Sequence, residues 1–454
     1  MKKLGVLFML LCVCANGFAM QNPDELFDSA TQIGDTTQGI PVSIEDAVRI
    51  ALQDNNSVKN AIKTRDVYRA QVKEYWSYVY PTLSLSGNYT RNFEIMQMTM
   101  NGQSFKVGYD NTFTAGLDAD WVLWSGGKVK AGVRIAKEVE KMGEYNLRSV
   151  RDSIEREVTN MCYAIILANA VSKVQEGHLE IAKQNLAEMK AKYKQGLSSN
   201  LDLLSQEVNV ANIEPLVIQA NNNYELGNLY LKRLLNRDPE DNIFLSWNEE
   251  NIKLPEVMDL DKLYMLSEEN RADLVLAKIN MNIAEKQITI ARSDHMPTIS
   301  AFANKYYNGQ TYHGFPQHSE DYYWTSAAGV RLSLPLFEGF KVNSVVEQKK
   351  LEYEQAKQDY EDTKKQVRIG IKAAWLNLIE SKKRMSSGVK VIDQSKENLE
   401  SMRKRYRAGL SSRLELDDAA IALTNAQLTY VQAVHDAFNA LADLKFAVGT
   451  EVRK

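Results

Sequence analysis

The most constraining feature of this sequence is an internal duplication. Three motifs of the first half recur in the second half, in the same order. The matched segments are residues 80–84 with 296–300, 121–129 with 334–342, and 190–203 with 403–416. The last two pairs share an offset of 213 residues, and the first pair has an offset of 216. Chance would not preserve both order and spacing, so we interpret the chain as two structural repeats.

The duplication predicts the domain boundaries. We place the first repeat at residues 41–236 and the second at residues 260–449. The equatorial segment between them, residues 237–259, contains prolines and a short apolar patch, so we expect a small packed feature there. A polar segment covers residues 20–40, and a short tail covers residues 450–454.

Each repeat contains a pair of amphipathic strands. In the first repeat, a helix expected from Ile44 to Tyr78 ends before Pro81, because proline cannot continue the helical hydrogen bonding. Apolar and polar residues then alternate with a period of two, which is typical of a strand with two different faces. Between the two strands, residues 91–108 are expected to form a polar loop. The apolar positions are Leu83, Leu85 and Tyr89 on the outgoing strand, and Phe113, Ala115, Leu117, Ala119 and Trp121 on the return strand.

The second repeat has the same pair, with an outgoing strand at residues 298–307 and a return strand at residues 322–334. Asp118, Asp120 and Arg331 fall on the polar face. Two hairpins are too few to close a barrel, and free sheet edges invite pairing. We therefore expect several chains to contribute strands to one closed wall.

Long helices make up the rest of each repeat. Residues 127–195 contain no proline, and they favour a helix of about 69 residues, on the order of 100 Å long. Gly196 is expected to end this helix, and Ser198 or Ser199 to cap a second helix that returns to Leu235.

The second repeat predicts the same antiparallel helix pair at residues 341–407 and 412–448. Pro215 lies within the return helix of the first repeat, where it is expected to kink or break the helix. The second repeat has no proline at the matching place.

The N-terminus has the features of a secretory signal peptide at residues 1–19. Lys2 and Lys3 precede an apolar run over residues 4–14, and the small residue Ala19 provides a cleavage point. The apolar run is about half of the roughly 20 residues that a spanning helix needs. We therefore expect an exported protein.

Cleavage after Ala19 would remove Cys12 and Cys14 and leave Cys162 as the single cysteine. Lipidation of Cys12 or Cys14 is a lesser alternative, because neither follows the small residue that normally precedes a lipidated cysteine. The formal net charge of −3 gives no indication of a polyionic partner such as nucleic acid.

At this point the sequence resembles the TolC family of outer membrane efflux proteins, the outer membrane factors. The resemblance rests on the signal peptide, the tandem repeat, the hairpins after Pro81 and Pro297, and the Tyr-x-x-Gly-Leu-Ser-Ser-x-Leu-acidic-Leu turn of each half. It implies a mainly α protein with a transmembrane β-barrel, in which a homotrimer contributes four strands per chain and the helices form a periplasmic α-barrel.

The resemblance also implies function and location. Members of this family are passive outer membrane ducts for drugs, other small molecules or secreted proteins, as parts of tripartite efflux pumps or type I secretion systems. The expected partners are a periplasmic adaptor (a membrane fusion protein), an inner-membrane pump or ABC transporter, and outer-membrane lipid. No catalytic residue, cofactor or metal is implied.

The family's periplasmic gate maps onto four residues of the second repeat, which are Glu415, Asp418, Tyr406 and Arg413. Glu415 and Asp418 are three residues apart and share a helix face. In a trimer they would form a ring of carboxylates that attracts cations. Alternatively, they are acidic residues favoured by a helix N-terminus, and Tyr406 packs between helices. Asp417 competes for the same role.

Two further groups of residues are assigned by position. The adaptor-facing turns are Gly196, Leu197, Ser198, Ser199, Gly409, Leu410, Ser411 and Ser412. The aromatic residues expected at the membrane interface are Trp121, Trp124, Tyr322 and Trp324. A soluble β-core could use the same aromatic residues, but the polar strand faces would then need another explanation.

Other functions have less support. Met96, Met98 and Met100 alternate along one loop, and thioethers suit Cu(I), so copper export is a minor alternative to simple packing. His313 and His318 lie in the other loop. An exported helical adhesin or scaffold would explain the helices but not the duplicated strand pairs. No phosphate-binding loop, Cys/His ligand set or Ser/His/Asp spacing supports an enzyme.

Overall fold

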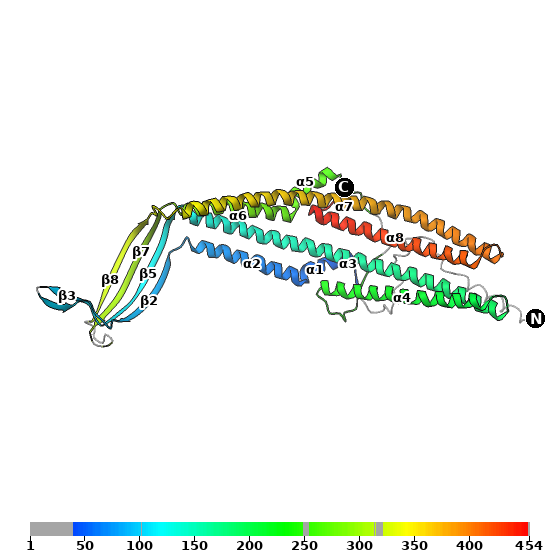
Figure 1. The fold of residues 1–454 in the computed structure, drawn as a ribbon, viewed down its shortest axis with the longest axis horizontal. Coiled ribbons are helices and arrows are strands. Elements are labelled where there is room, and N and C mark those ends of the chain that lie inside the picture. The colour runs from blue at the N-terminus through cyan, green and yellow to red at the C-terminus, as the bar shows by residue number, and fades with distance from the viewer. Residues whose placement is uncertain (1–39, 101, 248–253, 313, 315–320, 453–454) are drawn as a thin grey trace, which may run out of the picture. The chain divides into compact units, whose positions relative to one another are not determined.

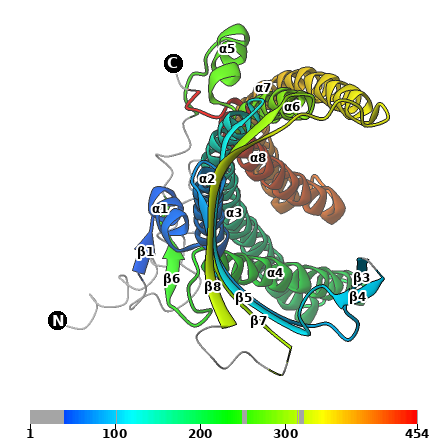
Figure 2. The same ribbon diagram turned by 90° about the vertical axis from the view of Figure 1, so that its left-hand side faces the viewer.

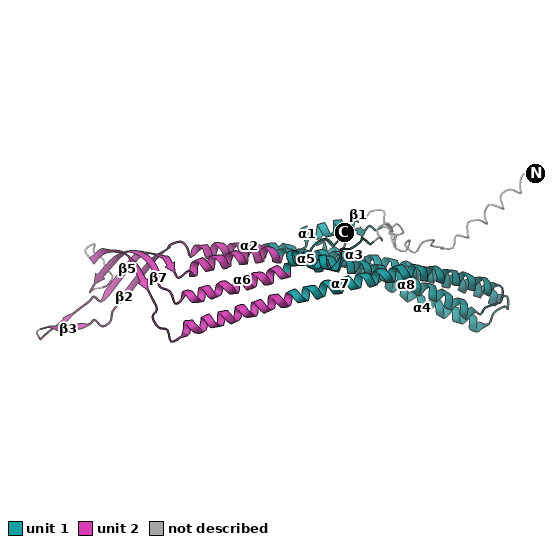
Figure 3. Ribbon diagram, turned by 90° about the horizontal axis from the view of Figure 1, so that it is seen from above, with its two compact units in different colours: residues 1–62, 147–272, 364–454 teal, residues 63–146, 273–363 magenta. Residues whose placement is uncertain are grey.

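The computed structural model describes residues 40–100, 102–247, 254–312, 314 and 321–452. The chain divides into two compact units, which Figure 3 shows in different colours. Unit 1 comprises residues 1–62, 147–272 and 364–454, and unit 2 comprises residues 63–146 and 273–363. The expected signal peptide with Cys12 and Cys14, the polar segment up to residue 39, and His313 and His318 lie outside the described residues.

Unit 2 contains a four-stranded antiparallel sheet. Its strands are β2 (Thr82–Arg91), β5 (Asn111–Ser125), β7 (Thr298–Thr311) and β8 (Tyr322–Ser333), in the order β2-β5-β7-β8. Each repeat supplies one hairpin, and the pairing of β5 with β7 joins the two hairpins. Figure 2 shows them as one curved layer.

The strand register confirms the predicted alternation. One row of paired residues across the four strands consists of Leu85, Leu117, Lys305 and Ser326. The neighbouring row contains Asp118. Directly opposite residues share a face, so the apolar positions of all four strands lie together. Lys305 is an exception on this face, and its ammonium group lies 4.8 Å from the centre of the Trp324 ring.

The two outer strands of the sheet have free edges. Within the described residues, β2 pairs with β5 alone and β8 pairs with β7 alone in this sheet. An unpaired strand edge presents a row of free backbone donors and acceptors. The expectation that one chain cannot close the sheet on itself is therefore confirmed.

The segment at residues 91–108 differs from the expected polar loop. It contains a second hairpin, formed by β3 (Gln97–Met100) and β4 (Gln103–Lys106). Met98 lies opposite Phe105, and both side chains are exposed. Met98 and Met100 belong to β3, and Met96 immediately precedes it. The strand was not predicted because its four residues are too few to reveal a period of two.

Two helices of equal length confirm the long helices predicted in both repeats. They are α3 (Lys128–Lys194) and α7 (Lys341–Arg407), each of 67 residues. Each is followed by a shorter antiparallel helix, α4 (Asn200–Leu234) or α8 (Arg413–Val448). At 1.5 Å per residue, α3 and α7 are each about 100 Å long.

The helix expected from Ile44 to Tyr78 is interrupted. It consists of α1 (Ile44–Asp54) and α2 (Asn56–Ser77), separated by Asn55 in an extended conformation. The Asn55 side chain accepts a hydrogen bond from the Ser57 backbone at 2.8 Å and donates one to the Leu234 carbonyl at 2.9 Å. A buried asparagine that caps the next helix explains the break.

Pro215 was expected to kink or break the return helix, and the helix is not broken there. Helix α4 continues from Asn200 to Leu234 with Pro215 inside it. Pro215 is exposed, so water can satisfy the carbonyl group that loses its helical donor. The matching helix of the second repeat is α8, which begins at Arg413, one residue after the predicted start at 412, and ends at Val448 as predicted. Helix α6 (Ala272–Ser293) precedes β7 in the second repeat, as α2 precedes β2 in the first.

Unit 1 has an extensive buried core. A parallel strand pair, β1 (Ile40–Val42) with β6 (Ile243–Leu245), forms a packed feature in the expected segment between the repeats. Helix α5 (Leu260–Asn270) follows this segment and packs against α8. The Trp247 ring lies 5.7 Å from that of Phe438. Among the described residues, no helix combines the length and apolar character needed to cross a membrane.

Candidate gate at the helix turns and the sheet–helix junction

The two long helices end in turns of the same form. Gly196 and Gly409 adopt left-handed conformations, with φ of 74° and 73°. The Leu197 N–H donates to the Lys192 carbonyl, and the Leu410 N–H donates to the Arg405 carbonyl, both at 2.9 Å. This hydrogen-bond pattern ends a helix with a glycine, as expected from the Gly-Leu-Ser-Ser motif.

Each return helix then begins with a capping box. Ser199 caps α4 and pairs with Asp202, while Ser412 caps α8 and pairs with Glu415. The Glu415 carboxylate accepts hydrogen bonds from the Ser412 N–H at 2.7 Å and from its hydroxyl at 3.1 Å. Of the two serines proposed for the first cap, Ser199 is the one used.

The carboxylates expected at the gate are both exposed. The Ser412 N–H and hydroxyl hold the pKa of Glu415 below its usual value, so this side chain is ionised at neutral pH. Asp418 lies one turn further along the same helix, with no ion pair in the described part of the chain. Two exposed negative charges therefore lie close to the start of α8.

A polar cluster joins the helix pair of the first repeat to that of the second. The Arg413 guanidinium lies 2.8 Å from the Asp417 carboxylate, and both side chains are largely buried. Gln206 of α4 donates to Asp417 at 2.9 Å and accepts from Arg413 at 3.3 Å. We call these three residues the bridge. It is the described polar link between α4 and α8 near the turns.

Two cations lie close to the Tyr406 ring. The Lys192 ammonium group is 4.8 Å from the ring centre, and the Arg413 guanidinium carbon is 5.6 Å from it. The ring also packs against the small apolar cluster around Leu399 and Leu416. Tyr406 therefore combines the packing role that its sequence position allowed with contacts to charged groups from both repeats. Tyr193, its counterpart, is more exposed.

The structure brings together two of the four expected gate residues. Tyr406 and Arg413 contact each other, whereas Glu415 and Asp418 remain outside the bridge. Gln206 was missed, because nothing in the sequence connects it with a residue more than 200 positions away. The four-residue spacing of Arg413 and Asp417 was a usable signal for an ion pair on one helix.

The residues expected to face an adaptor lie at the turns. Leu197 and Leu410 are exposed apolar side chains at the two tips. Their exposure leaves a large apolar group in contact with solvent beside each capping serine. Ser411 differs, because its hydroxyl oxygen is buried without a hydrogen-bond partner in the described structure.

The expected interfacial aromatic residues lie towards opposite ends of the strands. Trp121 lies near the helices, where its indole N–H donates to the Val79 carbonyl at 3.0 Å. Tyr322 and Trp324 lie near the other end and contact the Tyr307 ring at 4.8 and 4.9 Å. Through the strand pairing, Tyr322 is level with a position of β5 that lies eight residues from Trp121. At about 3.4 Å per residue, this separation is roughly 27 Å. This separation suits the apolar band of a bilayer, which is about 25 Å tall in outer membrane barrels.

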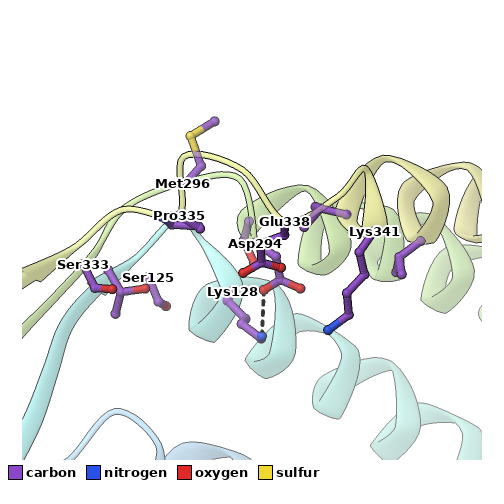
Figure 4. Close-up of a pocket in the computed structure, with 12 residues that line it drawn as sticks. Ser125, Lys128, Asp294, Met296, Ser333, Pro335, Glu338 and Lys341 are labelled. Atoms are coloured by element: carbon purple, nitrogen blue, oxygen red, sulfur yellow. Dashed lines mark hydrogen bonds and ion pairs between the residues drawn. The ribbon is translucent and has the colours of Figure 1, made fainter.

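A cavity of about 400 Å³ lies where the sheet meets the helices of unit 2. Figure 4 shows its lining, including the Lys128–Asp294 ion pair at 2.9 Å. Glu338 and Lys341 add one charge of each sign, so the four charged side chains balance. The cavity is partly open to solvent, and its lining is mainly polar.

No metal site is evident in the part of the chain that the structure describes, which contains no suitable group of three or more His, Cys, Asp or Glu side chains. Met96, Met98 and Met100 are exposed. Their role in copper export is still a hypothesis.

An amphipathic sheet with free edges, combined with two antiparallel pairs of very long helices, defines a subunit of an outer membrane channel with a helical extension. The family model for outer membrane efflux proteins matches residues 47–237 and 263–450. The chain belongs to the outer membrane efflux protein family.

Individual comparisons agree with this assignment. The outer membrane protein TolC of Salmonella enteritidis is 20% identical over 402 residues, covering 87% of this chain and 79% of TolC. The solved structure of VceC from Vibrio cholerae has a TM-score of 0.76 at 19% identity and covers 90% of this chain and 96% of VceC. The CmeC channel of Campylobacter jejuni has a TM-score of 0.77 at 18% identity, covering 94% of this chain and 92% of CmeC.

These similarities confirm the predicted TolC-like fold and the predicted family. The protein is an outer membrane efflux channel, and its helices form the periplasmic extension of that channel.

Proposed function

We propose that three copies of this chain form one channel that is closed near the helix turns at rest. The channel itself is passive and has no catalytic role. An inner-membrane pump or ABC transporter supplies the energy, and a periplasmic adaptor connects it to the channel. Drugs, other small molecules or secreted proteins then pass through the channel.

The bridge is the observation that supports closure at the turns. Arg413, Asp417 and Gln206 hold α4 and α8 together at hydrogen-bonding distance. A charged pair with little exposure is strongly coupled to its partners, because an isolated charge there would be poorly solvated. Separation of the two helix pairs would have to break these contacts, so the bridge favours the closed arrangement.

The exposed carboxylates beside the bridge supply a test in planar bilayers. The double substitution Glu415→Ala with Asp418→Ala would remove six negative charges from a trimer. We expect block by a divalent or trivalent cation to weaken by at least about tenfold, since the attracting ring is gone. The measurement is single-channel current against cation concentration.

The matched control is Asp202→Ala, which removes the equivalent capping carboxylate of the first repeat. Both changes lose a capping box, so any effect of helix fraying is common to the two variants. Cation block that stays unchanged in the double variant would place the constriction elsewhere.

We also propose that the two turns contact the adaptor, because each presents an exposed leucine at its tip. A photoreactive amino acid at Leu197 or Leu410 is expected to give crosslinks to the adaptor in cells. The same probe at exposed Leu351 of α7, within unit 2, is the comparison. Crosslinks at Leu351 without any at the two turns would contradict the proposal.

A further inference from the structure

The duplication relates a contact inside the chain to the two free edges of the sheet. Strand β5 is the return strand of the first hairpin, and β8 is its counterpart in the second. Likewise, β7 is the counterpart of β2. Because β5 pairs with β7 within the chain, the equivalent pairing for the free edge of β8 is with β2 of a second copy.

Two matched glycines show which space a second copy would fill if its β2 paired with β8. Gly126 and Gly339 occupy the same place in the two repeats and have almost the same φ, 61° and 62°. A Cβ atom added to Gly126 would lie 2.6 Å from the Cβ atom of Met296 and 2.9 Å from the Ser293 carbonyl oxygen. A Cβ atom added to Gly339 would meet nothing within 4 Å. The space beside Gly339 is thus open in one chain where the space beside Gly126 is closed.

The side chains around these glycines differ in the same way. Leu123 and Trp124, which precede Gly126, are 46% and 42% exposed. Their counterparts Leu336 and Phe337 are 89% and 74% exposed. Contact with water or lipid alone would not explain this difference in exposure, because the two pairs occupy equivalent places in the two repeats.

The other edge of the sheet carries a complementary apolar group. Tyr80 is the counterpart of Met296 and is 66% exposed, with Tyr78 next to it at 60%. Both lie where α2 passes into β2. The residue that closes the space beside Gly126 therefore has an exposed aromatic equivalent at the opposite edge.

We infer that a second copy of this chain places its Tyr80 against Gly339, and that Leu336 and Phe337 are covered in the same contact. We call this contact the junction clasp. It rests on the proposed trimer and adds the residues that join one copy to the next where the sheet meets the helices. Figure 4 shows the equivalent place within the chain, with Met296 at the turn before β7.

The conformation of Phe340 supports an interface at this place. It has a φ of 62°, whereas its counterpart in the first repeat is Gly127. A bulky residue in the left-handed region is costly, and such residues persist where the surroundings require them. The Phe340 ring lies 5.4 Å from that of Phe337 at an angle of 90°, so it braces the ring that the junction clasp covers.

The first experiment substitutes asparagine for Gly339. Asparagine tolerates a left-handed conformation better than most residues other than glycine. The main change is therefore an added side chain in the space that Tyr80 of the second copy is proposed to fill. We expect the ratio of trimer to monomer in mild detergent, measured by native mass spectrometry, to fall by at least about tenfold, as overpacking does at a tight contact. Gly127→Asn is the control, because a Cβ atom there also meets nothing within 4 Å but faces no counterpart of Tyr80.

The second experiment tests the register. Trp121 pairs with Ala301 within the chain, and the equivalent residues are Leu334 of one copy and Leu85 of the next. The double variant Leu334→Cys with Leu85→Cys should form disulfide-linked trimers on mild oxidation, whereas Leu334→Cys with Ser84→Cys should not, since Ser84 faces the opposite side. Burial raises the pKa of the Cys162 thiol to about 12, so this native cysteine stays protonated and unreactive.

The outcomes separate the junction clasp from the proposed trimer. A trimer that tolerates Gly339→Asn as well as Gly127→Asn, or that crosslinks through Ser84 instead of Leu85, overturns the junction clasp and leaves the trimer standing. A wild-type protein that is monomeric overturns both. If Gly339→Asn does not fold, the cysteine pairs still decide between a neighbouring copy and lipid as the group that covers Leu336 and Phe337.

Discussion

Replacing Asp417 with asparagine is expected to raise the resting conductance of the channel severalfold. The substitution keeps the size of the side chain but removes its charge, leaving the Arg413 guanidinium without its partner at 2.8 Å. Both side chains are at most one-fifth exposed, so the loss is larger than for a surface pair and amounts to about 1–3 kcal/mol per chain. Such a change shifts a closed-to-open equilibrium by about 5- to 150-fold. Single-channel recording without adaptor measures it.

Two controls make this result specific to the bridge. Asp202→Asn changes an exposed carboxylate at the start of α4 whose hydrogen bonds, in the described part of the chain, are to Ser199 of its own capping box, and it is expected to leave the resting conductance within about twofold. Gln206→Leu removes the partner on α4, so its effect should not add to that of Asp417→Asn. Full additivity, or an equal rise in Asp202→Asn, would contradict a closing role for the bridge.

Replacing Gly126 with valine is expected to abolish assembly of the channel in the outer membrane. The new Cβ atom would overlap the Cβ atom of Met296 and approach the Ser293 carbonyl, and one of those contacts is with the backbone. The φ of 61° adds a backbone cost that is high for a β-branched residue. Together these costs reach about 3–5 kcal/mol, which is a large part of the stability of a typical domain. The measurement is the amount of detergent-extractable, protease-resistant protein in outer membrane fractions.

Gly127→Ala is the matched control. Its φ of 89° also favours glycine, but an added Cβ atom has open space around it. It should therefore retain most of the folded protein, because it carries the backbone cost alone, about 1 kcal/mol. Equal loss in the two variants would show that backbone conformation matters at this turn and the packing on Met296 does not.

The features that the sequence predicted well are those with a local periodic signal. The period of two located β5 and β8, and the absence of proline with the Gly-Leu-Ser-Ser motif located the ends of α3 and α7. Duplication strengthened each assignment, because every feature could be checked against its counterpart. The break at Asn55 was missed because its cause is a hydrogen bond to the distant Leu234 carbonyl.

Tertiary contacts explain what could not be predicted at the candidate gate. Arg413 and Tyr406 were identified through their place in the turn motif, but Asp417, the ion-pair partner of Arg413, was considered only as a competitor for the gate role. Gln206 lies on another helix pair, and its pairing with Asp417 depends on how those pairs pack. The Met98–Phe105 hairpin was likewise hidden, since two strands of four residues carry too few positions to reveal a period.

The equal 67-residue lengths of α3 and α7 have a consequence for stoichiometry. A trimer would present six turns with the same glycine conformation and the same serine cap, and an adaptor that recognises backbone form could occupy all six. Only the three turns of the second repeat carry the Arg413–Asp417 pair. Six adaptor molecules bound per trimer would therefore split into two classes, according to whether the turn that each contacts carries this ion pair.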